Sequence, residues 1–167
     1  ILRTDHPHYY RGKEGGESEN QFVDRIVSNL ENLIISENPE TIAAFIAEPI
    51  TGASGVIVPP EGYYEKVQSV LSKYNIMFWA DEVITGFGRT GSDFGCTTMN
   101  IHDPDMMTFA KQLSSAYMPI SASAIRRDVY EAMIDQSAAA GAFGHGYTYS
   151  GHPVACAVAL RVLETDE

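Results

Sequence analysis

The stretch YNIMFWADEVITGFGRTG, residues 74–91, decides the fold that we expect for this chain of 167 residues. Its apolar first half predicts a buried strand that ends at Asp81, directly before a segment with three glycines. Open parallel sheets place their chemistry at the carboxyl ends of such strands. Asp81 is therefore a candidate site residue, although an isolated aspartate at such a position more commonly caps a turn.

A lone lysine follows thirty positions later in the chain. Lys111 is the only charged residue between Asp105 and Arg126, and it directly follows a predicted strand over residues 106–110. Apolar surroundings disfavour an ammonium group, which makes such a lysine a candidate amine nucleophile. The alternative is a lysine whose stem lies on the apolar run while its amine reaches water. Together, Asp81 and Lys111 suit a cofactor with a carbonyl on one side and a basic ring nitrogen on the other.

Helix and strand patterns alternate along the chain. The expected elements are helices at about 22–34, 64–74, 128–137 and from 152 onward, and strands at 41–47, near 120–125 and in the two runs described above. This alternation predicts an α/β fold with a mostly parallel sheet and helices on both faces. No repeat or linker divides the chain, so we expect one domain. The last helix is apolar on nearly every face over residues 154–163, and we expect it to be buried.

Composition narrows the function classes. Hydrophobic residues make up 44% of the chain and charged residues 20%, which is typical of a globular protein, and we expect a cytoplasmic enzyme. The formal net charge of -11 disfavours nucleic acid as a partner, and no apolar run approaches the length of a membrane span. Cys96 and Cys156 form no disulfide framework or metal motif, and His6 and His8 lie in a polar stretch, so we expect no metal site.

Five short blocks occur in order from about position 40 to the end of the chain. They are AEPI at 47–50, PPEGY at 59–63, ADEVITGFGRTG at 80–91, TFAK at 108–111 and TYSGHP at 148–153. Together they resemble the successive signatures of the class III aminotransferases, which are pyridoxal-phosphate enzymes of fold type I. Two segments are most similar in sequence to the branch of the family that acts on amines or omega-amino acids with pyruvate. They are LSSAYMPISA at 113–122 and GHGYTYSGHP at 144–153.

The resemblance also bears on the extent of the chain, since members of this family are more than twice as long. The chain begins with Ile1 rather than methionine, and we expect residues 1–167 to be an internal part of the cofactor-binding large domain, with the small domain absent. The family's phosphate-binding loop and the aromatic residue that stacks on the pyridine ring are then expected before Ile1. The arginine that many members use for substrate carboxylates is expected after the last residue.

The resemblance implies a role for each matching residue. Lys111 would bind pyridoxal phosphate covalently and then move a proton between substrate and cofactor. Asp81 would pair with the pyridine nitrogen, and Val83 would pack against the ring face, a role that is compatible with a plain core valine. Glu48 would lie near the substrate, the alternative being a surface carboxylate at a strand end. Thr148 matches a threonine that binds the cofactor phosphate of the neighbouring subunit, which implies a homodimer.

One residue departs from the family pattern. Gln112 stands where many members have glycine after the lysine, and we expect its backbone to need no positive φ. The function implied is transfer of an amino group from an amine or omega-amino acid to pyruvate or a similar keto acid. Two alternatives remain open: an aminomutase or decarboxylase of the same fold, and a catalytically silent piece that only packs or dimerises.

Overall fold

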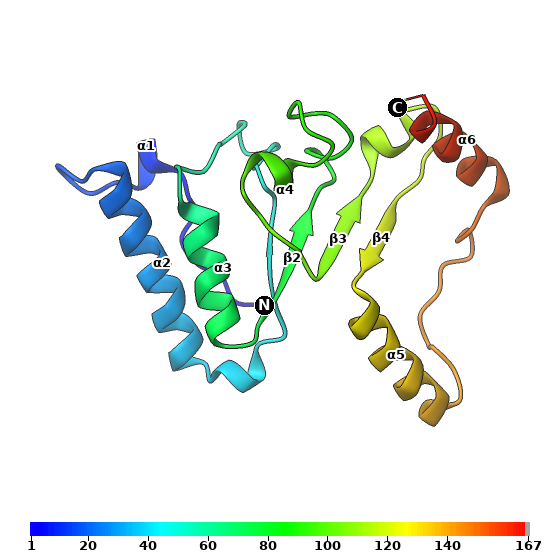
Figure 1. The fold of residues 1–167 in the computed structure, drawn as a ribbon, viewed down its shortest axis with the longest axis horizontal. Coiled ribbons are helices and arrows are strands. Elements are labelled where there is room, and N and C mark those ends of the chain that lie inside the picture. Colours follow the sequence, from blue (N-terminus) through cyan, green and yellow to red (C-terminus); the bar gives the residue numbers. More distant parts are fainter. Residues whose placement is uncertain (166–167) are drawn as a thin grey trace.

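The computed structural model describes residues 1–165, and its centre is a sheet of four strands in the order β1-β2-β3-β4 (Figure 1). The strands β1 (Ala44–Ala47), β2 (Met77–Asp81) and β3 (Met106–Phe109) are parallel, and β4 (Ala122–Ile125) pairs antiparallel with β3. A parallel connection needs a crossover, usually a helix, and the link from β3 to β4 contains only a short 3-10 turn. The predicted α/β fold with a mostly parallel sheet is confirmed.

Two amphipathic helices form the layer beside this sheet, since α3 (Tyr63–Lys73) packs against β2 and α2 (Glu19–Ser36) packs against α3. A reciprocal capping box starts α2: the Ser18 hydroxyl accepts from the Gln21 amide, and the Gln21 side chain accepts from the Ser18 amide. The core they share with the sheet consists of Phe22, Val23, Ile26, Val27, Leu30, Ile34, Tyr63, Tyr64, Val67, Val70, Leu71, Ile76, Phe78, Ala80, Cys96 and Ile101.

The other predicted elements are found with small shifts of their ends. The first strand starts three residues later than the expected Thr41, because a 3-10 turn, η1 (Pro39–Thr41), occupies the start of the predicted range. The Asn38 side chain caps this turn by accepting from the Glu40 amide at 3.2 Å. The remaining elements are α1 (Tyr9–Gly12), α4 (Gly95–Thr98), η2 (Lys111–Ser114), α5 (Arg127–Ala140) and α6 (Pro153–Leu163).

The predicted burial of the last helix is wrong. α6 packs against η2 and buries only Ala155, Ala159 and Val162. Val154 and Leu160 are 55% and 60% exposed. Only one side of α6 has an element of residues 1–165 to pack against, so its other apolar side chains stay in contact with solvent.

The segment before α6 is also exposed. α5 contains no buried residue, and all of residues 141–154 are exposed. In Figure 1 these segments lie beyond β4, at the opposite end of the molecule from α2 and α3. None of the helices in residues 1–165 has the length and hydropathy that crossing a membrane requires.

Candidate active site

Three of the predicted site residues lie along one edge of the sheet, where its parallel strands end. Glu48 directly follows β1, Asp81 is the last residue of β2, and Lys111 follows β3 by two positions. The register pairs Asp81 with Thr108, three residues before Lys111, and pairs the residue before Glu48 with the residue before Asp81. Because ligands of such sheets bind outside the carboxyl ends of the strands, the three side chains share the expected location of a site.

Asp81 is partly buried, and its carboxylate is held by its own turn. The Val83 amide donates to Asp81 Oδ1 at 3.1 Å, so the turn-capping hydrogen bond that an aspartate commonly makes is present here. No hydrogen bond to Oδ2 is found within residues 1–165, which leaves that oxygen for another donor. Beside it, Trp79 Nε1 donates to Thr108 Oγ1 at 2.7 Å and ties β2 to β3.

Lys111 is the first residue of η2, and its backbone is in the left-handed region with φ 45°. A lysine in this region is strained by roughly 1–3 kcal/mol, and strain of this kind is concentrated at functional sites. Lys111 is exposed, which agrees with the alternative that its amine reaches water. The turn of η2 directs Leu113 and Ser114 inward instead. Lys111 forms no salt bridge within residues 1–165.

Gln112, the departure from the family pattern, has no positive φ, as predicted. Its side chain donates to Ser115 Oγ at 3.3 Å and accepts a long hydrogen bond of 3.5 Å from Arg89 Nη2. Arg89 belongs to the glycine-containing loop after β2. Gln112 therefore connects that loop to the turn that carries Lys111.

Three phenylalanines join the same loop to the end of β3. The ring centroids of Phe87 and Phe109 are 5.4 Å apart, and Phe94 lies 5.7 Å from each of the other two rings. Offset or edge-on aromatic pairs at such distances contribute about 0.5–1.5 kcal/mol each beyond the area they bury. This cluster connects the loop after β2 to the last residue of β3, which lies two positions before Lys111.

Glu48 is partly buried and held on two sides. Its Oε2 accepts from the Gly52 amide at 2.9 Å, and its carbonyl oxygen accepts from the Tyr64 hydroxyl at 2.5 Å. Burial raises the pKa of Tyr64 well above its usual range, so that hydroxyl remains a donor at all physiological pH values. The position of Glu48 is thus set by both the loop after β1 and α3.

The structure does not bring Thr148 to the residues at the strand ends through any hydrogen bond within residues 1–165. It lies in the exposed segment between α5 and α6, five residues before the first residue of α6. Val83, in contrast, is partly buried and reaches Asp81 through its own amide. Of the predicted cofactor-binding residues, Asp81, Val83 and Lys111 therefore belong to one neighbourhood, and Thr148 stands apart in this chain.

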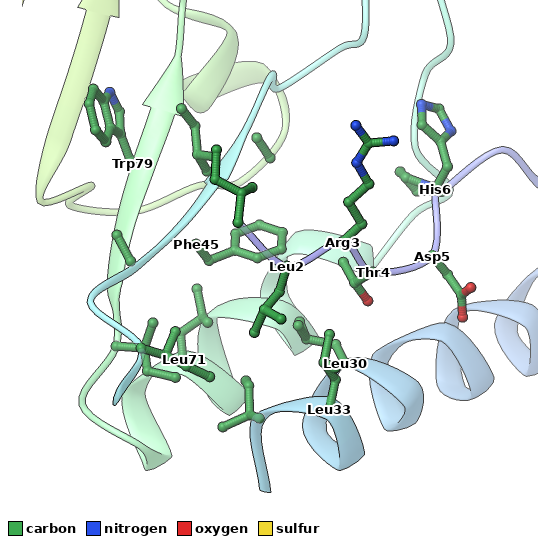
Figure 2. Close-up of a pocket in the computed structure, with 18 of the residues that line it drawn as sticks. Leu2, Arg3, Thr4, Asp5, His6, Leu30, Leu33, Phe45, Leu71 and Trp79 are labelled. Atoms are coloured by element: carbon green, nitrogen blue, oxygen red, sulfur yellow. The ribbon is translucent and has the colours of Figure 1, made fainter. Parts of the chain in front are cut away.

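A separate groove of about 910 Å³ runs between the N-terminal segment, α2 and β1 (Figure 2). Figure 2 shows Leu2, Leu30, Leu33, Phe45 and Leu71 around it, so its walls are largely apolar. Glu48 is among its lining residues, but Asp81 and Lys111 are not. The groove is thus distinct from the site formed by the ends of β2 and β3.

Both cysteines are free, Cys96 buried and Cys156 exposed. Burial, together with the neighbouring Glu82 carboxylate, raises the pKa of the Cys96 thiol well above its usual range, so the thiol stays protonated. In the part of the chain that the structure describes, no three His, Cys, Asp or Glu side chains come together as a metal site needs.

Residues 6–167 match the sequence pattern of a known family, described as Aminotransferase class-III. The chain belongs to the class-III aminotransferases. It is 57% identical over 164 residues to "Gamma aminobutyrate transaminase 3, chloroplastic" of Solanum lycopersicum, covering 98% of this chain and 31% of that protein. The solved structure of a transaminase with L-ala is 55% identical with a TM-score of 0.96, over 98% of this chain and 38% of that one. The structure of an omega transaminase from Pseudomonas jessenii in complex with PMP is 58% identical with a TM-score of 0.92. The match covers 95% of this chain and 35% of that one.

These comparisons confirm the family resemblance that the sequence suggested. The chain spans about a third of the length of the curated relatives it matches. What an aminotransferase of this family does as a whole protein therefore depends on more residues than the 167 of this chain.

Sequence reasoning missed one residue of this aminotransferase that lies directly beside Asp81. Glu82 is fully buried, and its carboxylate accepts hydrogen bonds from Thr85 and from two backbone amides of α4. The only signal in the sequence was a second acidic residue at a strand end, where a surface position is the usual expectation for glutamate. The aromatic cluster of Phe87, Phe94 and Phe109 was missed as well, because Phe109 comes fifteen residues after Phe94 and belongs to a different element.

Proposed function

We propose that this aminotransferase chain is part of the pyridoxal-phosphate-binding large domain of a transaminase, with the small domain outside residues 1–167. The whole protein would move an amino group from an amine or omega-amino acid to pyruvate or a similar keto acid. The relative named for gamma-aminobutyrate supports an omega-amino acid as donor. The omega transaminase in complex with PMP supports the cofactor class.

The chain's own residues fit pyridoxal phosphate. Lys111 has an exposed amine without a salt bridge in residues 1–165, and Asp81 has one carboxylate oxygen without a hydrogen bond in the same part of the chain. A lysine amine without a salt bridge and a carboxylate oxygen without a hydrogen bond, at the ends of adjacent parallel strands, match the aldehyde and the ring nitrogen of this cofactor. This pairing is the observation that carries the proposal.

When bound, pyridoxal phosphate supplies an aldehyde that condenses with primary amines and a pyridine ring that withdraws electrons. Lys111 would hold it covalently through Nζ. With its Nζ released from the cofactor, Lys111 would accept the proton that leaves the substrate carbon and return it at a different carbon. Asp81 would accept a hydrogen bond from the ring N–H, because its negative charge favours the protonated nitrogen.

The other predicted residues have supporting roles in this proposal. Val83 would pack against one face of the ring, and Glu48, fixed by the Gly52 amide, would lie near the substrate amine. Thr148 would donate its hydroxyl to the cofactor phosphate of a second subunit, which makes the active protein a homodimer. The exposure of residues 141–154 supports this, since that segment is available to a second subunit.

The partners we propose are small amine and keto acid substrates. The formal net charge of -11 disfavours nucleic acid. We propose a cytoplasmic location for the whole protein; the relatives named as chloroplastic or mitochondrial define the alternative that cell fractionation would distinguish.

The experiment uses the full-length protein. Purified enzyme is incubated with pyruvate and a panel of amines that includes gamma-aminobutyrate, and alanine formation is measured together with the visible absorbance of the bound cofactor. We expect alanine to form with at least one omega-amino acid or primary amine. Loss of carbon dioxide from the donor, or migration of its amino group without alanine, would instead assign a decarboxylase or an aminomutase. Absence of cofactor absorbance would overturn the proposal.

A further inference from the structure

Glu82 is the buried acidic residue that the proposed reaction does not use. Its exposure is 0%, and it follows Asp81 directly at the end of β2. Successive residues of an extended segment point to opposite sides, so the carboxylate of Glu82 points away from that of Asp81. The two acidic residues therefore have different surroundings, the first open to a ligand and the second enclosed by protein.

Three donors satisfy the Glu82 carboxylate. Oε2 accepts from Thr85 Oγ1 at 2.5 Å and from the Gly95 amide at 3.0 Å, and Oε1 accepts from the Cys96 amide at 2.7 Å. Within residues 1–165 it has no salt bridge. A buried carboxylate without a cation is costly unless it is well hydrogen-bonded, so these three bonds have to persist for the residue to remain buried.

The bonds close a loop that starts and ends at Glu82. The chain leaves the sheet after β2, runs through residues 83–94, and returns where Gly95 and Cys96 meet the carboxylate. Packing at this closure is tight, because a Cβ on Gly95 would lie 2.6 Å from Thr85 Cβ and 3.0 Å from Pro49 Cβ. Pro49 directly follows Glu48, so the closure also touches the end of β1.

The backbone of Glu82 also forms hydrogen bonds that fix the start of this loop. Its amide donates to the Thr108 carbonyl at 3.0 Å, and its carbonyl accepts from the Gly86 amide at 3.0 Å. The turn over residues 82–86 is therefore held by both the carbonyl and the side chain of Glu82. That turn presents the Val83 amide to Asp81 Oδ1, which orients the carboxylate and leaves Oδ2 unengaged.

We propose that Glu82 is a positioning residue: its buried carboxylate closes residues 83–94 into a fixed loop and thereby orients Asp81 toward the ring nitrogen of the cofactor. This inference rests on the proposed function for its effect on turnover. The closure of the loop itself is a property of the protein without cofactor. A misplacement of about 1 Å at a reacting group lowers turnover roughly 100-fold, which sets the size of the expected effect.

The test compares Glu82→Gln and Glu82→Asp with Glu40→Gln in the full-length protein. Glu40 is an exposed glutamate of η1 and serves as the control for loss of one charge. In Glu82→Gln the new NH₂ group replaces an acceptor oxygen and faces N–H or O–H donors, so the loop closure is weakened. We expect kcat to fall about 30- to 100-fold with little change in the KM for the amine. Glu82→Asp keeps both acceptor oxygens and should recover part of the loss, and Glu40→Gln should match the wild type.

A double-mutant cycle distinguishes orientation of Asp81 from a general loss of structure. If Glu82 acts through Asp81, Glu82→Gln lowers kcat no further in an Asp81→Asn background, whereas independent effects multiply. A multiplied loss would overturn the proposal, as would wild-type kcat in a folded Glu82→Gln enzyme.

Hydrogen exchange of the cofactor-free protein gives a second readout that does not depend on activity. We expect the amides of residues 84–97 to exchange at least about 10-fold faster in Glu82→Gln, with the strand amides of β2 unchanged. Unchanged exchange in the loop would overturn the inference even if the enzyme proves to be a transaminase. Faster exchange in a protein that never binds cofactor would instead overturn the proposed function and leave the loop closure standing.

If Glu82→Gln does not fold, Thr85→Val removes a single donor from the same carboxylate while it conserves shape. Thr85 is buried, and its hydroxyl bonds only Glu82 among the described residues. We expect a kcat loss of roughly 3- to 10-fold and faster exchange confined to the loop, since one hydrogen bond to a charged group is removed. Wild-type values for both quantities would overturn the proposal.

Discussion

Residues 9–114, the core region, and residues 127–154, the distal region, contain similar apolar side chains but differ in what those side chains touch. In the core region Val23 and Val67 have no exposed surface. In the distal region Phe143, Tyr147 and Tyr149 are 55%, 73% and 81% exposed. Residue type is therefore not what separates the regions. The core region supplies its own packing partners, whereas no residue of the distal region is buried among residues 1–165.

The same difference divides the candidate site. Glu48, Asp81 and Lys111 lie in the core region, and contacts within this chain fix the strand ends that carry them. Thr148 lies in the distal region, where it is exposed and its side chain forms no hydrogen bond within residues 1–165. Large apolar side chains that remain exposed commonly mark a surface that another molecule covers. The core region therefore carries the candidate site residues that one chain can position by itself, and the distal region carries the residue that we propose needs a second subunit.

The largest effect is expected at Lys111. In the full-length protein, Lys111→Ala should abolish transamination and remove all cofactor that borohydride can trap on the protein, because no other lysine of residues 1–165 follows β2 in the chain. The fold should be retained, since the side chain is exposed and unpaired within residues 1–165. Lys111→Arg, which keeps the charge but loses the nucleophile, is the matched control and should be equally inactive. Trapped cofactor in either variant would remove Lys111 from its role.

A pair of phenylalanines tests the comparison by stability. Phe22→Ala in the core region should lower the free energy of unfolding by about 3–5 kcal/mol, because it leaves a cavity in a packed cluster. Phe143→Ala in the distal region should change the free energy of unfolding of the dissociated subunit by less than about 0.5 kcal/mol. Urea unfolding at protein concentrations below subunit association measures both. Equal losses would mean that the distal region has its own core.

Asp81→Asn sharpens the comparison inside the core region. Asparagine keeps an acceptor for the Val83 amide, so the turn should persist while the charge beside the ring nitrogen is lost. We expect kcat to fall roughly 100- to 1000-fold, the usual result of deleting a preorganised electrostatic contact. Steady-state kinetics with pyruvate as acceptor measure this loss. Near-normal turnover would reduce Asp81 to a cap of its own turn.

Thr148→Ala gives a smaller effect that depends on the second subunit. Loss of one hydrogen bond to a charged phosphate should raise the dissociation constant of pyridoxal phosphate about 10- to 100-fold. The effect should appear only in the dimer, because Thr148 contributes to the neighbouring site in our proposal. Thr148→Ser keeps the hydroxyl and should bind cofactor like the wild type. A loss of affinity that is the same in isolated subunits would place Thr148 in its own site.

The success of sequence reasoning follows the same division. The strand that ends at Asp81 could be predicted, because a continuous apolar run of that length is typical of strands in parallel sheets. Placement of Lys111 after the next strand followed from the same pattern. The burial of α6 could not be predicted, since apolar composition shows what a helix can bury and not which partner it has.

Two features of the site depend on contacts between distant residues, which local patterns do not contain. The burial of Glu82 is possible only because the amides of Gly95 and Cys96 return to it from thirteen and fourteen residues away. Lys111 is exposed and has a left-handed backbone, and this conformation has no signature in the residues around it because glycine would be the usual choice. For Glu82 the residue type alone indicated a surface position, opposite to the burial that the structure shows.

The smallest effect is expected for two ion pairs. One lies at the start of α2 in the core region, and the other lies at the start of α5 in the distal region. In Glu17–Arg25 the side chains are 11% and 28% exposed, whereas in Arg126–Asp128 they are 50% and 61% exposed. A hydrogen bond from its arginine lowers the pKa of each carboxyl to about 2, from 4.5 for Glu17 and 3.8 for Asp128. Because the pKa of each carboxyl is lower in the folded state, each pair stabilises the fold at pH values above the pKa that the carboxyl has in the unfolded chain. That stabilisation is lost as the pH falls toward 2.

Solvent screens the more exposed pair more strongly, so the two pairs should differ although their pKa values are alike. We expect Glu17→Gln to flatten the dependence of the free energy of unfolding on pH between about 4.5 and 2, and Asp128→Asn to change it less. Urea unfolding at several pH values in low and high salt measures both slopes. The difference between the variants should shrink in high salt, because salt screens exposed charges. A larger effect for Asp128→Asn would mean that the distal region is packed more closely in solution than its exposed side chains indicate, and the contrast between the two regions would then fail.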